Sequence, residues 1–440
     1  MQFYSLTFLY IFLPVSLIIY NLVPKKYKNL SIAAISVLFF VLSQPQYAWI
    51  FIAEILVQYV FSRRMCIFSD NPKKKKAVFT VAVVLNILIM LGFSVMNQIA
   101  GIEIPLGTMV ISFTAIGYFV DVYKGEADYI NSFDDFAVFM GFFGKLYRGP
   151  LVRSVDRENL IGEKTFSLEK TGEGICLFLR GMAKYVLLAT PIKKVYDSLC
   201  EANIEEMSVV GEWLGIVSIG MMIFYDLSGF CDMARGLGFC FGMNLEKNFY
   251  YPFQSPSVTD FLDRFNMTVT GFFRHYVYDN LHTKEQSMIQ FIIDTLLISM
   301  LCGVWFGIRM NYVLWGLYIA FFIIIEGAFL NRVLEKVPRF FARIYTFCVT
   351  MLSMTLFSAN NTGIADTFKA MLGFGAQIIT DRVYYIVSEN VLVLAAGAFF
   401  LSSIFDIITR KIQKRNAFIY NTICVAESFA FLVLITAELV

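Results

Sequence analysis

The sequence carries little charge for its length. Asp, Glu, Lys and Arg make up 16% of its 440 residues, and 36 basic against 34 acidic side chains leave a formal net charge of +2. In soluble domains about a quarter of the residues are charged. The low charge excludes an ordinary water-soluble protein, and the near-neutral balance gives no reason to expect a nucleic-acid partner.

Metal-binding residues are also scarce. The chain has two histidines, His275 and His282, and its eight cysteines form no Cys-x-x-Cys pair and no Cys/His cluster with metal-ligand spacing. Most of the cysteines lie in or beside apolar segments, where cysteine behaves as a small hydrophobic residue. We therefore expect no metal site and a packing role for the cysteines.

Apolar residues, by contrast, make up 58% of the chain and occur in long blocks. A helix of about 20 apolar residues crosses the hydrocarbon core of a bilayer. The pattern predicts an all-α polytopic protein of the cell membrane with about eleven or twelve membrane segments. No soluble domain or internal repeat is visible, which favours a single integral-membrane domain over residues 1–440. The blocks, of which 174–191 and 208–226 could be re-entrant, lie near 4–23, 30–43, 47–62, 77–96, 104–122, 174–191, 208–226, 288–307, 311–330, 344–360, 389–407 and 418–438.

Clusters of lysine and arginine between the blocks indicate the orientation of the chain, because short loops rich in these residues stay on the cytoplasmic side. Placing all four main clusters in the cytoplasm agrees with the number of blocks between them and predicts that both termini are extracytoplasmic. The clusters are Lys25, Lys26 and Lys28; Arg63, Arg64 and Lys73 to Lys76; Arg332, Lys336, Arg339 and Arg343; and Arg410, Lys411, Lys414 and Arg415.

Three segments depart from the apolar pattern. Residues 224–281 are dense in Asp, Arg, Asn, Tyr and Gly, include His275 and contain the aromatic run 248–253, which reads NFYYPF. Residues 104–107 place a proline at the start of a block, and residues 142–153 combine aromatic and basic residues with a Gly-Pro break. Polar groups and broken backbone at membrane depth occur where they contact protein or a watery cavity, so these segments are candidate functional sites.

The same segments resemble a known family. IPLGTMVISFTAIGYFVDVYKG (104–125), FFGKLYRGPLVR (142–153), the polar stretch 224–281 and GVWFGIRMNYVLWGLY (303–318) resemble, in this order, the membrane-bound O-acyltransferase (MBOAT) family. The likeness is to its bacterial branch, which acetylates alginate-type polysaccharides or passes D-alanine to teichoic acid. It covers about residues 100–375, with N-terminal helices in 1–99 and C-terminal helices in 376–440.

The resemblance implies a ring of membrane helices around a central funnel. An acyl donor, either acyl-CoA or an acyl-carrier thioester, would enter from the cytoplasm and act as a co-substrate, with no bound cofactor. The acceptor would be a hydroxyl of an envelope glycan or teichoic acid, and an acyl carrier protein and an extracytoplasmic esterase-like protein would be partners beside the lipid bilayer. A histidine would act as the general base, since its pKa lies near the working pH.

The sequence departs from the family at the histidines themselves. The bacterial branch has Arg-Trp-His where this chain has Arg264-Phe265-Asn266, and Trp-His-Gly where it has Trp305-Phe306-Gly307. A further family histidine falls at Ile319. Asn266 resembles the eukaryotic branch, which has asparagine at this position. We expect Asn266 and Trp305 to face one cavity, with Phe306 at its constriction.

His275 is the alternative candidate for the base. The sequence favours instead a histidine held by a local partner or at the membrane interface. If 258–280 were one continuous helix, the nine residues between Asn266 and His275 would place them about half a turn apart, on opposite faces. His282, beside Lys284 and Glu285, is expected at the cytoplasmic surface.

The remaining candidates are charged residues, each of which has a structural and a binding interpretation. Asp226 and Asp232 lie in or at the end of an apolar block, where a carboxylate needs a partner such as Arg235 or Arg264. They could form structural ion pairs or bind the donor or acceptor. Arg148 and Arg153 could bind a phosphate or carboxylate of the donor, or anchor the chain at lipid headgroups.

Three functions follow from these observations. The first is acyl transfer to a cell-envelope polymer. The second is a catalytically lapsed member of the family that serves as a conduit or scaffold for an acyl carrier or lipid-linked substrate, which the missing histidines suggest. The third, a transporter or flippase, predicts paired broken helices in two similar halves, and the sequence shows no such halves.

Overall fold

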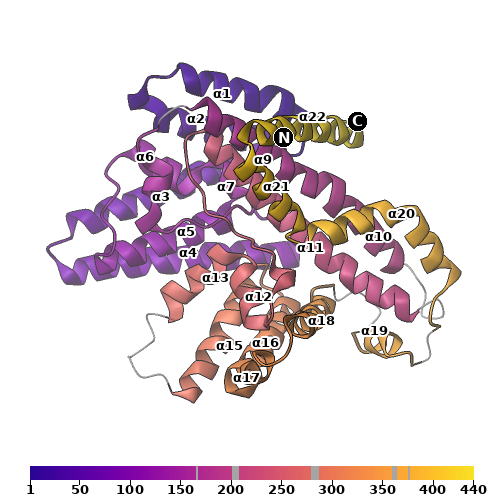
Figure 1. Ribbon diagram of the computed structural model, residues 1–440. Coiled ribbons are helices and arrows are strands. Elements are labelled where there is room, and N and C mark those ends of the chain that lie inside the picture. Colours follow the sequence, from indigo (N-terminus) through magenta and orange to yellow (C-terminus); the bar gives the residue numbers. More distant parts are fainter. Residues whose placement is uncertain (165–166, 201–207, 279–286, 359–363, 375–376) are drawn as a thin grey trace. The chain divides into compact units, whose positions relative to one another are not determined.

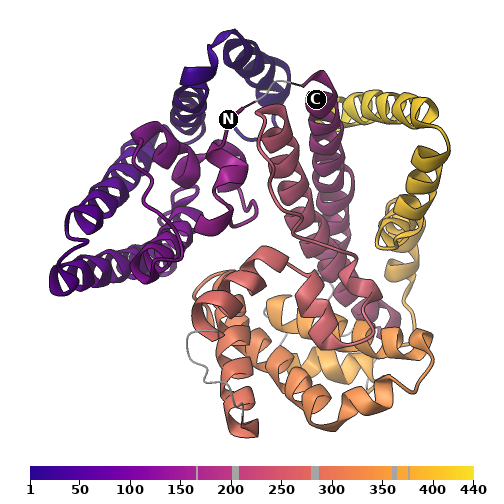
Figure 2. The ribbon, with the colours of Figure 1, turned by 60° about the vertical axis from the view of Figure 1, so that its left-hand side comes forward.

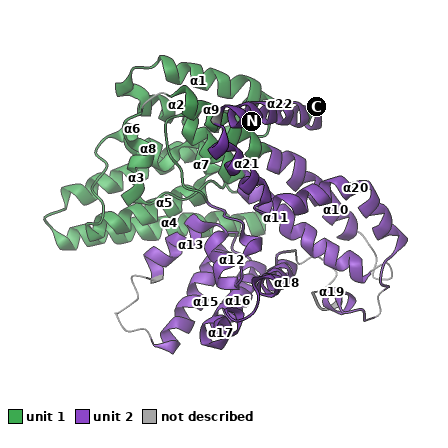
Figure 3. Cartoon of the chain, in the orientation of Figure 1, with its two compact units in different colours: residues 1–182, 230–247, 439–440 green, residues 183–229, 248–438 purple. Residues whose placement is uncertain are grey.

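The computed structural model describes residues 1–164, 167–200, 208–278, 287–358, 364–374 and 377–440. It is 81% helical, and within these ranges extended backbone pairs only as isolated bridges. The prediction of an all-α protein is confirmed. The chain divides into two compact units: unit 1 comprises residues 1–182, 230–247 and 439–440, and unit 2 comprises residues 183–229 and 248–438 (Figure 3).

Unit 1 contains the N-terminal helices (Figure 1). Its elements are a π-helical turn Phe8–Phe12, α1 Leu13–Leu22, a short turn Lys25–Tyr27, α2 Lys28–Ser43, a short turn Pro45–Tyr47, α3 Ala48–Ile67, α4 Pro72–Ala100, α5 Thr108–Lys124, α6 Phe133–Gly141, α7 Phe143–Leu146, a short turn Ser154–Asp156, α8 Glu158–Ile161, α9 Leu168–Ala183 and the last third of α11 Val209–Cys240.

Unit 2 contains the first two thirds of α11, the helix α10 before it and the helices that follow residue 247. Its other elements are a π-helical turn Lys184–Ala189, α10 Thr190–Cys200, a short turn Pro252–Gln254, α12 Val258–Arg264, α13 Met267–Phe273, a π-helical turn Arg274–Tyr278, α15 Met288–Val304, α16 Met310–Ile325, a π-helical turn Glu326–Leu330, α17 Asn331–Leu334, α18 Arg339–Ser358, α19 Ile364–Met371, α20 Asp381–Phe400, α21 Ile404–Arg415 and α22 Ala417–Leu439.

Eight helical segments of the described chain are long and apolar enough to cross a membrane, and two further apolar helices, Phe8–Leu22 and Met288–Val304, are shorter. Together with α3 and α5, they account for the twelve apolar blocks of the sequence. The possibly re-entrant blocks 174–191 and 208–226 belong to continuous segments of 33 and 32 residues, which are long enough to span. The chain is a multi-pass membrane protein.

Close helix packing in unit 1 depends on small residues. A Cβ atom at Gly236 of α11 would lie 2.5 Å from the carbonyl oxygen of Gly174 in α9, so the two backbones meet where neither has a side chain. Small residues allow this approach in membrane proteins, where packing replaces the hydrophobic effect as the main attraction between helices.

A polar pair joins two other helices of unit 1. The buried amides of Gln58 in α3 and Asn86 in α4 exchange hydrogen bonds of 2.9 and 3.1 Å.

The segment 142–153 is irregular, as its Gly-Pro break predicts. α6 ends at Gly141, the single turn α7 follows, and Arg148 adopts a left-handed conformation with φ 71°. Lys145 is fully buried, and its amine donates a hydrogen bond to the carbonyl oxygen of Phe139. A Cβ atom at Gly149 would lie 2.5 Å from the Cα of Lys145, so only glycine fits at this bend.

Candidate active site

The polar stretch contains a break between two short helices of unit 2. α12 ends at Arg264, Phe265 is extended with φ −104° and ψ 114°, and Asn266 adopts a left-handed conformation with φ 56°. Asparagine is one of the few residues other than glycine that tolerates this conformation. One continuous helix, the condition under which Asn266 and His275 would lie on opposite faces, is therefore not met, and that relation does not follow.

The aromatic run 248–253 pairs with this break. Phe249 and Phe265 form an isolated antiparallel bridge. The amide of Tyr250 donates to the carbonyl of Arg264 at 3.0 Å, and the amide of Met267 donates to the carbonyl of Asn248 at 2.9 Å. Backbone polar groups released by a helix break need such partners when they are buried. The aromatic run thus provides hydrogen-bond partners for the backbone groups at the break.

The side chain of Asn248 completes the connection. Its Nδ2 donates a hydrogen bond of 2.7 Å to Oδ1 of Asn266. Its Oδ1 accepts hydrogen bonds from the amide and the hydroxyl of Thr268, at 2.8 and 2.9 Å. Asn248 and Asn266 are both buried. Asn266 is therefore not on the lipid surface, and its side chain is held in one orientation.

A buried carboxylate fixes the other end of α12. Glu326 is fully buried in the π-helical turn that follows α16. Its two oxygens accept hydrogen bonds from the amide of Val258 at 2.7 Å, and from the amide and hydroxyl of Thr259 at 3.0 and 2.7 Å. A negative charge at a helix N-terminus is favourable because the first amides of the helix have no intrahelical partners. Glu326 thus ties α12 to the α16 segment.

Trp305 and Phe306 lie in the turn between α15 and α16, and both are half-buried. The two helices approach closely at glycines. A Cβ atom at Gly303 would lie 2.1 Å from the carbonyl oxygen of Tyr312, and one at Gly316 would lie 2.4 Å from that of Ser299. Close backbone contacts between the two helices therefore fix the ends of the turn near each other.

Phe306 belongs to an aromatic cluster. Its ring centroid lies 5.1 Å from that of Phe357 and 5.9 Å from that of Trp315, both edge to face, and 6.3 Å from that of Tyr312. Trp315 is buried and donates a hydrogen bond of 3.1 Å to the hydroxyl of Ser353. Ile319, the third position of a family histidine, is fully buried in α16. Phe306 and Ile319 carry no group that accepts a proton.

His275 lies in the π-helical turn that follows α13 and is half-buried. Its ring packs edge to face on Tyr276 with centroids 4.8 Å apart. Single π-helical turns occur frequently at functional sites. His282 lies outside the described residues, so its expected surface position stays a prediction.

The charged candidates form local pairs. Asp232 lies 3.5 Å from Arg235, one of its two expected partners. Arg264 instead pairs with Asp260, four residues earlier, at 2.9 Å. Asp226 is half-buried within α11. The pairing of Asp232 with Arg235 is compatible with the structural interpretation, and the role of Asp232 stays a prediction.

Arg148 and Arg153 both reach the surface of unit 1. The Arg148 guanidinium lies 5.9 Å from the ring centroid of Phe230. Arg153 pairs with Asp156 at 3.2 Å in the next turn, and its side chain is 41% exposed. Neither the role in donor binding nor the role in anchoring at headgroups is decided by these contacts.

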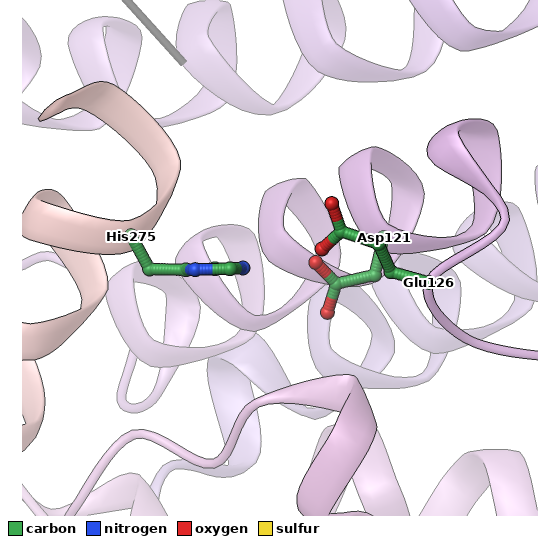
Figure 4. A group of neighbouring side chains, drawn as sticks. All are labelled: Asp121, Glu126 and His275. Carbon is green, nitrogen blue, oxygen red and sulfur yellow. The ribbon is translucent and has the colours of Figure 1, made fainter. Parts of the chain in front are cut away.

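Two carboxylates meet at the C-terminal end of α5. The carboxylate groups of Asp121 and Glu126 lie side by side (Figure 4), with oxygens within 4.8 Å of one another. The turn is closed by the amide of Glu126, which donates to the carbonyl of Asp121 at 2.8 Å, and Lys124 lies 3.4 Å from Glu126. Figure 4 also shows His275, which belongs to unit 2. Two carboxylates with a lysine beside them do not make a metal centre by themselves.

The sequence profile of the membrane-bound O-acyltransferase family matches residues 37–363, more than half of the chain. The chain belongs to this family. The resemblance inferred from the four motifs is thereby confirmed, and the family match includes the α12–α13 break, the α15–α16 turn and the π-helical turn with Glu326.

Several bacterial proteins are similar to this MBOAT protein. The probable alginate O-acetylase of Azotobacter vinelandii is 28% identical over 400 residues, which cover 87% of this chain and 80% of the relative. The peptidoglycan O-acetyltransferase of Helicobacter pylori is 25% identical over 251 residues, 56% of this chain and 47% of the relative. The teichoic acid D-alanyltransferase of Bacillus subtilis is 32% identical over 117 residues, 25% of this chain and 30% of the relative.

Two residues of this site were not singled out from the sequence. Asn248 was noted only as the first residue of the aromatic run, and its bonds to Asn266 and Thr268 depend on the helix break. Glu326 was not singled out at all. A lone carboxylate within the apolar block 311–330 was a detectable signal, because such groups are rare in membrane segments unless a specific partner holds them.

Proposed function

We propose that this chain is a membrane-embedded acyltransferase that transfers an acetyl or D-alanyl group to hydroxyls of a cell-envelope polysaccharide or teichoic acid. Membership of the MBOAT family is the observation that carries the proposal. The similar proteins named above as an alginate O-acetylase, a peptidoglycan O-acetyltransferase and a teichoic acid D-alanyltransferase support the reaction type and the class of acceptor.

The reaction is an ester-forming exchange. The acceptor hydroxyl oxygen attacks the carbonyl carbon of the donor thioester, a C–O bond forms and the C–S bond breaks. The proton of the hydroxyl passes to a general base, and the thiolate that leaves takes up a proton. Acyl-CoA and an acyl-carrier thioester both provide the thioester that this reaction needs. A donor of either kind would reach the protein from the cytoplasm.

Within unit 2, we assign two roles to the candidate residues. His275 is the proposed general base, since the family positions Phe306 and Ile319 cannot accept a proton. Asn266 is the proposed hydrogen-bond donor to the carbonyl oxygen of the acyl donor. Its Oδ1 is occupied by Asn248, and its Nδ2 has no hydrogen-bond partner among the described residues. A fixed amide donor of this kind stabilises the charge that develops on the carbonyl oxygen.

Further parts of the proposal concern the surroundings of the reaction. Asp226, Asp232, Arg264 and Trp305 are candidates for contacts with substrate, and Arg148 and Arg153 are candidates for contacts with a charged donor. An acyl carrier protein on the cytoplasmic side and an esterase-like protein outside the membrane are the proposed partners. Placing the four basic clusters in the cytoplasm leaves both termini outside.

A transfer assay tests this function. The purified protein in liposomes receives labelled acetyl-CoA or a D-alanyl-carrier thioester, with alginate-type polysaccharide or teichoic acid as acceptor. Label is expected in the polymer, and His275→Ala is expected to reduce the rate by about 10²–10⁴-fold, the usual contribution of a positioned base. Tyr276→Phe, on the same turn, is the matched control and should retain the wild-type rate.

Two other outcomes have distinct meanings. Transfer that persists in His275→Ala would move the base to another residue and leave the acyltransferase proposal standing. No transfer by the native chain, together with transfer by Phe306→His, would contradict the proposal and indicate a lapsed enzyme that retained the family frame.

A further inference from the structure

The helix α21, Ile404–Arg415, differs from its neighbours on both sides. It lies between α20 and α22, both of which are long and apolar enough to span the membrane. At about 1.5 Å per residue its 12 residues extend about 18 Å, too short to cross a core of about 30 Å. It also carries Asp406, Arg410, Lys411, Lys414 and Arg415. α21 therefore stays on one side of the bilayer.

The connections to the spans keep α21 at the membrane surface. Three residues, 401–403, separate it from α20, and Asn416 alone separates it from α22. Figure 2 shows the resulting sharp corner between the two yellow helices at the C-terminal end of the chain. With connections this short, both ends of α21 must lie where the neighbouring helices leave the hydrocarbon core.

α21 presents an apolar face that no part of the described chain covers. None of its residues is buried. Ile404, Ile407 and Ile408 are exposed by 50%, 48% and 48%, and their spacing of three and four residues places them on one side of the helix. A short helix with an exposed apolar face and cations on it is typical of segments that lie in the bilayer interface.

The cations of α21 gather in its last two turns. Arg410 lies 3.7 Å from Asp406, whereas Lys411, Lys414 and Arg415 form no ion pair with any residue that the structure describes. Basic residues at a helix C-terminus are favourable for the helix itself. Three unpaired cations beside an apolar face at the membrane surface match the negative headgroups of anionic lipids.

The opposite side of α21 holds the corner that precedes α12. The hydroxyl of Ser403, just before α21, donates to Oε1 of Gln254 at 3.0 Å. Asp406 is hydrogen-bonded to Tyr251, whose pKa is raised by burial and by this carboxylate. Tyr251 is in a left-handed conformation with φ 48° and lies three residues after Asn248. α21 is thus in contact with the segment that holds the helix break.

We propose that α21 is an interfacial helix that inserts Ile404, Ile407 and Ile408 into the bilayer and binds anionic phospholipid headgroups through Lys411, Lys414 and Arg415. Bound lipid holds α21 at the surface and, through Asp406 and Ser403, holds the corner at 251–254. This inference does not depend on the proposed function, because it concerns lipid binding alone.

Depth-dependent quenching tests the insertion. Ile408→Trp and Gln413→Trp place a fluorophore on the apolar and the opposite side of α21 in the full chain, and the four native tryptophans give the background signal of the wild type. In vesicles that contain phosphatidylcholine brominated on its acyl chains, the added fluorescence of Ile408→Trp should be quenched and that of Gln413→Trp should not. Equal quenching of the two, or quenching of neither, would overturn the insertion.

Lipid enrichment tests the headgroup site. The protein is reconstituted in phosphatidylcholine with phosphatidylglycerol, extracted gently, and the retained phosphatidylglycerol is measured by mass spectrometry. Replacing Lys411, Lys414 and Arg415 by Gln should lower the enrichment by at least about fivefold, the effect of one basic residue near a charged surface. The matched control replaces Arg332, Lys336 and Arg339 by Gln, three exposed cations beside other spans.

The comparison of these two triple variants decides the result. The expected outcome is a loss in the α21 variant that clearly exceeds the loss in the control. An equal loss in both would assign the enrichment to the general positive charge of the loops, and no loss in the α21 variant would exclude a headgroup site. A native thermal unfolding profile in both variants ensures that a loss reports on binding rather than on folding.

Discussion

The side chain of Asn248 donates a 2.7 Å hydrogen bond to the side chain of Asn266 across a break between two helices. Asn248 also accepts two hydrogen bonds from Thr268, on the far side of the same break. One buried amide therefore determines how α12 and α13 are joined. Asn266 is the proposed donor to the substrate in this chain, so its orientation bears on the proposed function as well as on stability.

Replacing Asn248 by Ala is expected to lower the free energy of unfolding by about 2–4 kcal/mol, because the buried oxygen of Asn266 and the half-buried amide and hydroxyl of Thr268 lose a hydrogen-bond partner. Asn248→Asp should cost less, since a carboxylate still accepts from Thr268 while the bond to Asn266 is lost. The measurement is the thermal unfolding midpoint in detergent, together with hydrogen exchange of the Thr268 amide. Asn21→Ala, an exposed asparagine with one local bond, is the control and should have little effect. Similar losses in Asn248→Ala and Asn21→Ala would contradict this role.

Glu326→Ala is expected to lower the stability of unit 2 by about 3–5 kcal/mol, since hydrogen bonds to a charged group are strong and three donors at the start of α12 lose their acceptor. Glu326→Gln retains one side-chain oxygen and should fall between Ala and the wild type. Unfolding in detergent and hydrogen exchange of the Val258 and Thr259 amides would report the effect. The exposed Glu335, nine residues later, provides the control Glu335→Ala. Faster hydrogen exchange confined to helices other than α12 would argue against the role of Glu326 at the start of α12.

The extent to which the sequence predicts this structure follows from the kind of interaction involved. The apolar blocks predicted the membrane helices because crossing a bilayer requires only sufficient length and an apolar composition. The break at Phe265 and Asn266 could not be predicted, since it depends on backbone pairing with residues 248–250, which are far away in the chain. The partner of Arg264 was missed for the opposite reason, because Arg264 pairs with Asp260 on its own helix rather than with either aspartate of α11. Short-range pairs compete with the long-range pairs that a sequence suggests.

Gly316→Ala is expected to destabilise the α15–α16 pair by about 1–3 kcal/mol, the usual effect of overpacking. The added Cβ would lie 2.4 Å from the Ser299 carbonyl oxygen, which is backbone and cannot rotate away. Gly92→Ala in α4 is the matched control, because no atom lies within 4 Å of a Cβ at that position. The control should be neutral or stabilising by about 0.4–1 kcal/mol through a less flexible unfolded chain. Thermal unfolding of the two variants measures the difference, and equal midpoints would contradict the close approach.

Burial lowers the pKa of Lys164 to about 8 from its usual value of 10.5, although Asp135 and Glu158 act in the opposite direction. Its amine donates to the carbonyl of Leu160, and only 6% of the residue is exposed. Because the pKa is lower in the folded state than in the unfolded state, the unfolded chain binds more protons between pH 8 and 10.5, and stability from this group rises with pH across that window. Below pH 8 the contribution is constant and unfavourable.

Lys164→Met is therefore expected to raise the unfolding midpoint at pH 7, with a gain that shrinks as the pH approaches 10. A difference of this size corresponds to about 3 kcal/mol at neutral pH, at 1.36 kcal/mol for each unit of pKa. Thermal unfolding in detergent from pH 7 to 10 measures it, with Lys170→Met, an exposed lysine six residues later, as the control. A wild-type midpoint that shows the same pH dependence as the Lys164→Met midpoint would mean that Lys164 stays charged in the folded protein and that water reaches its amine.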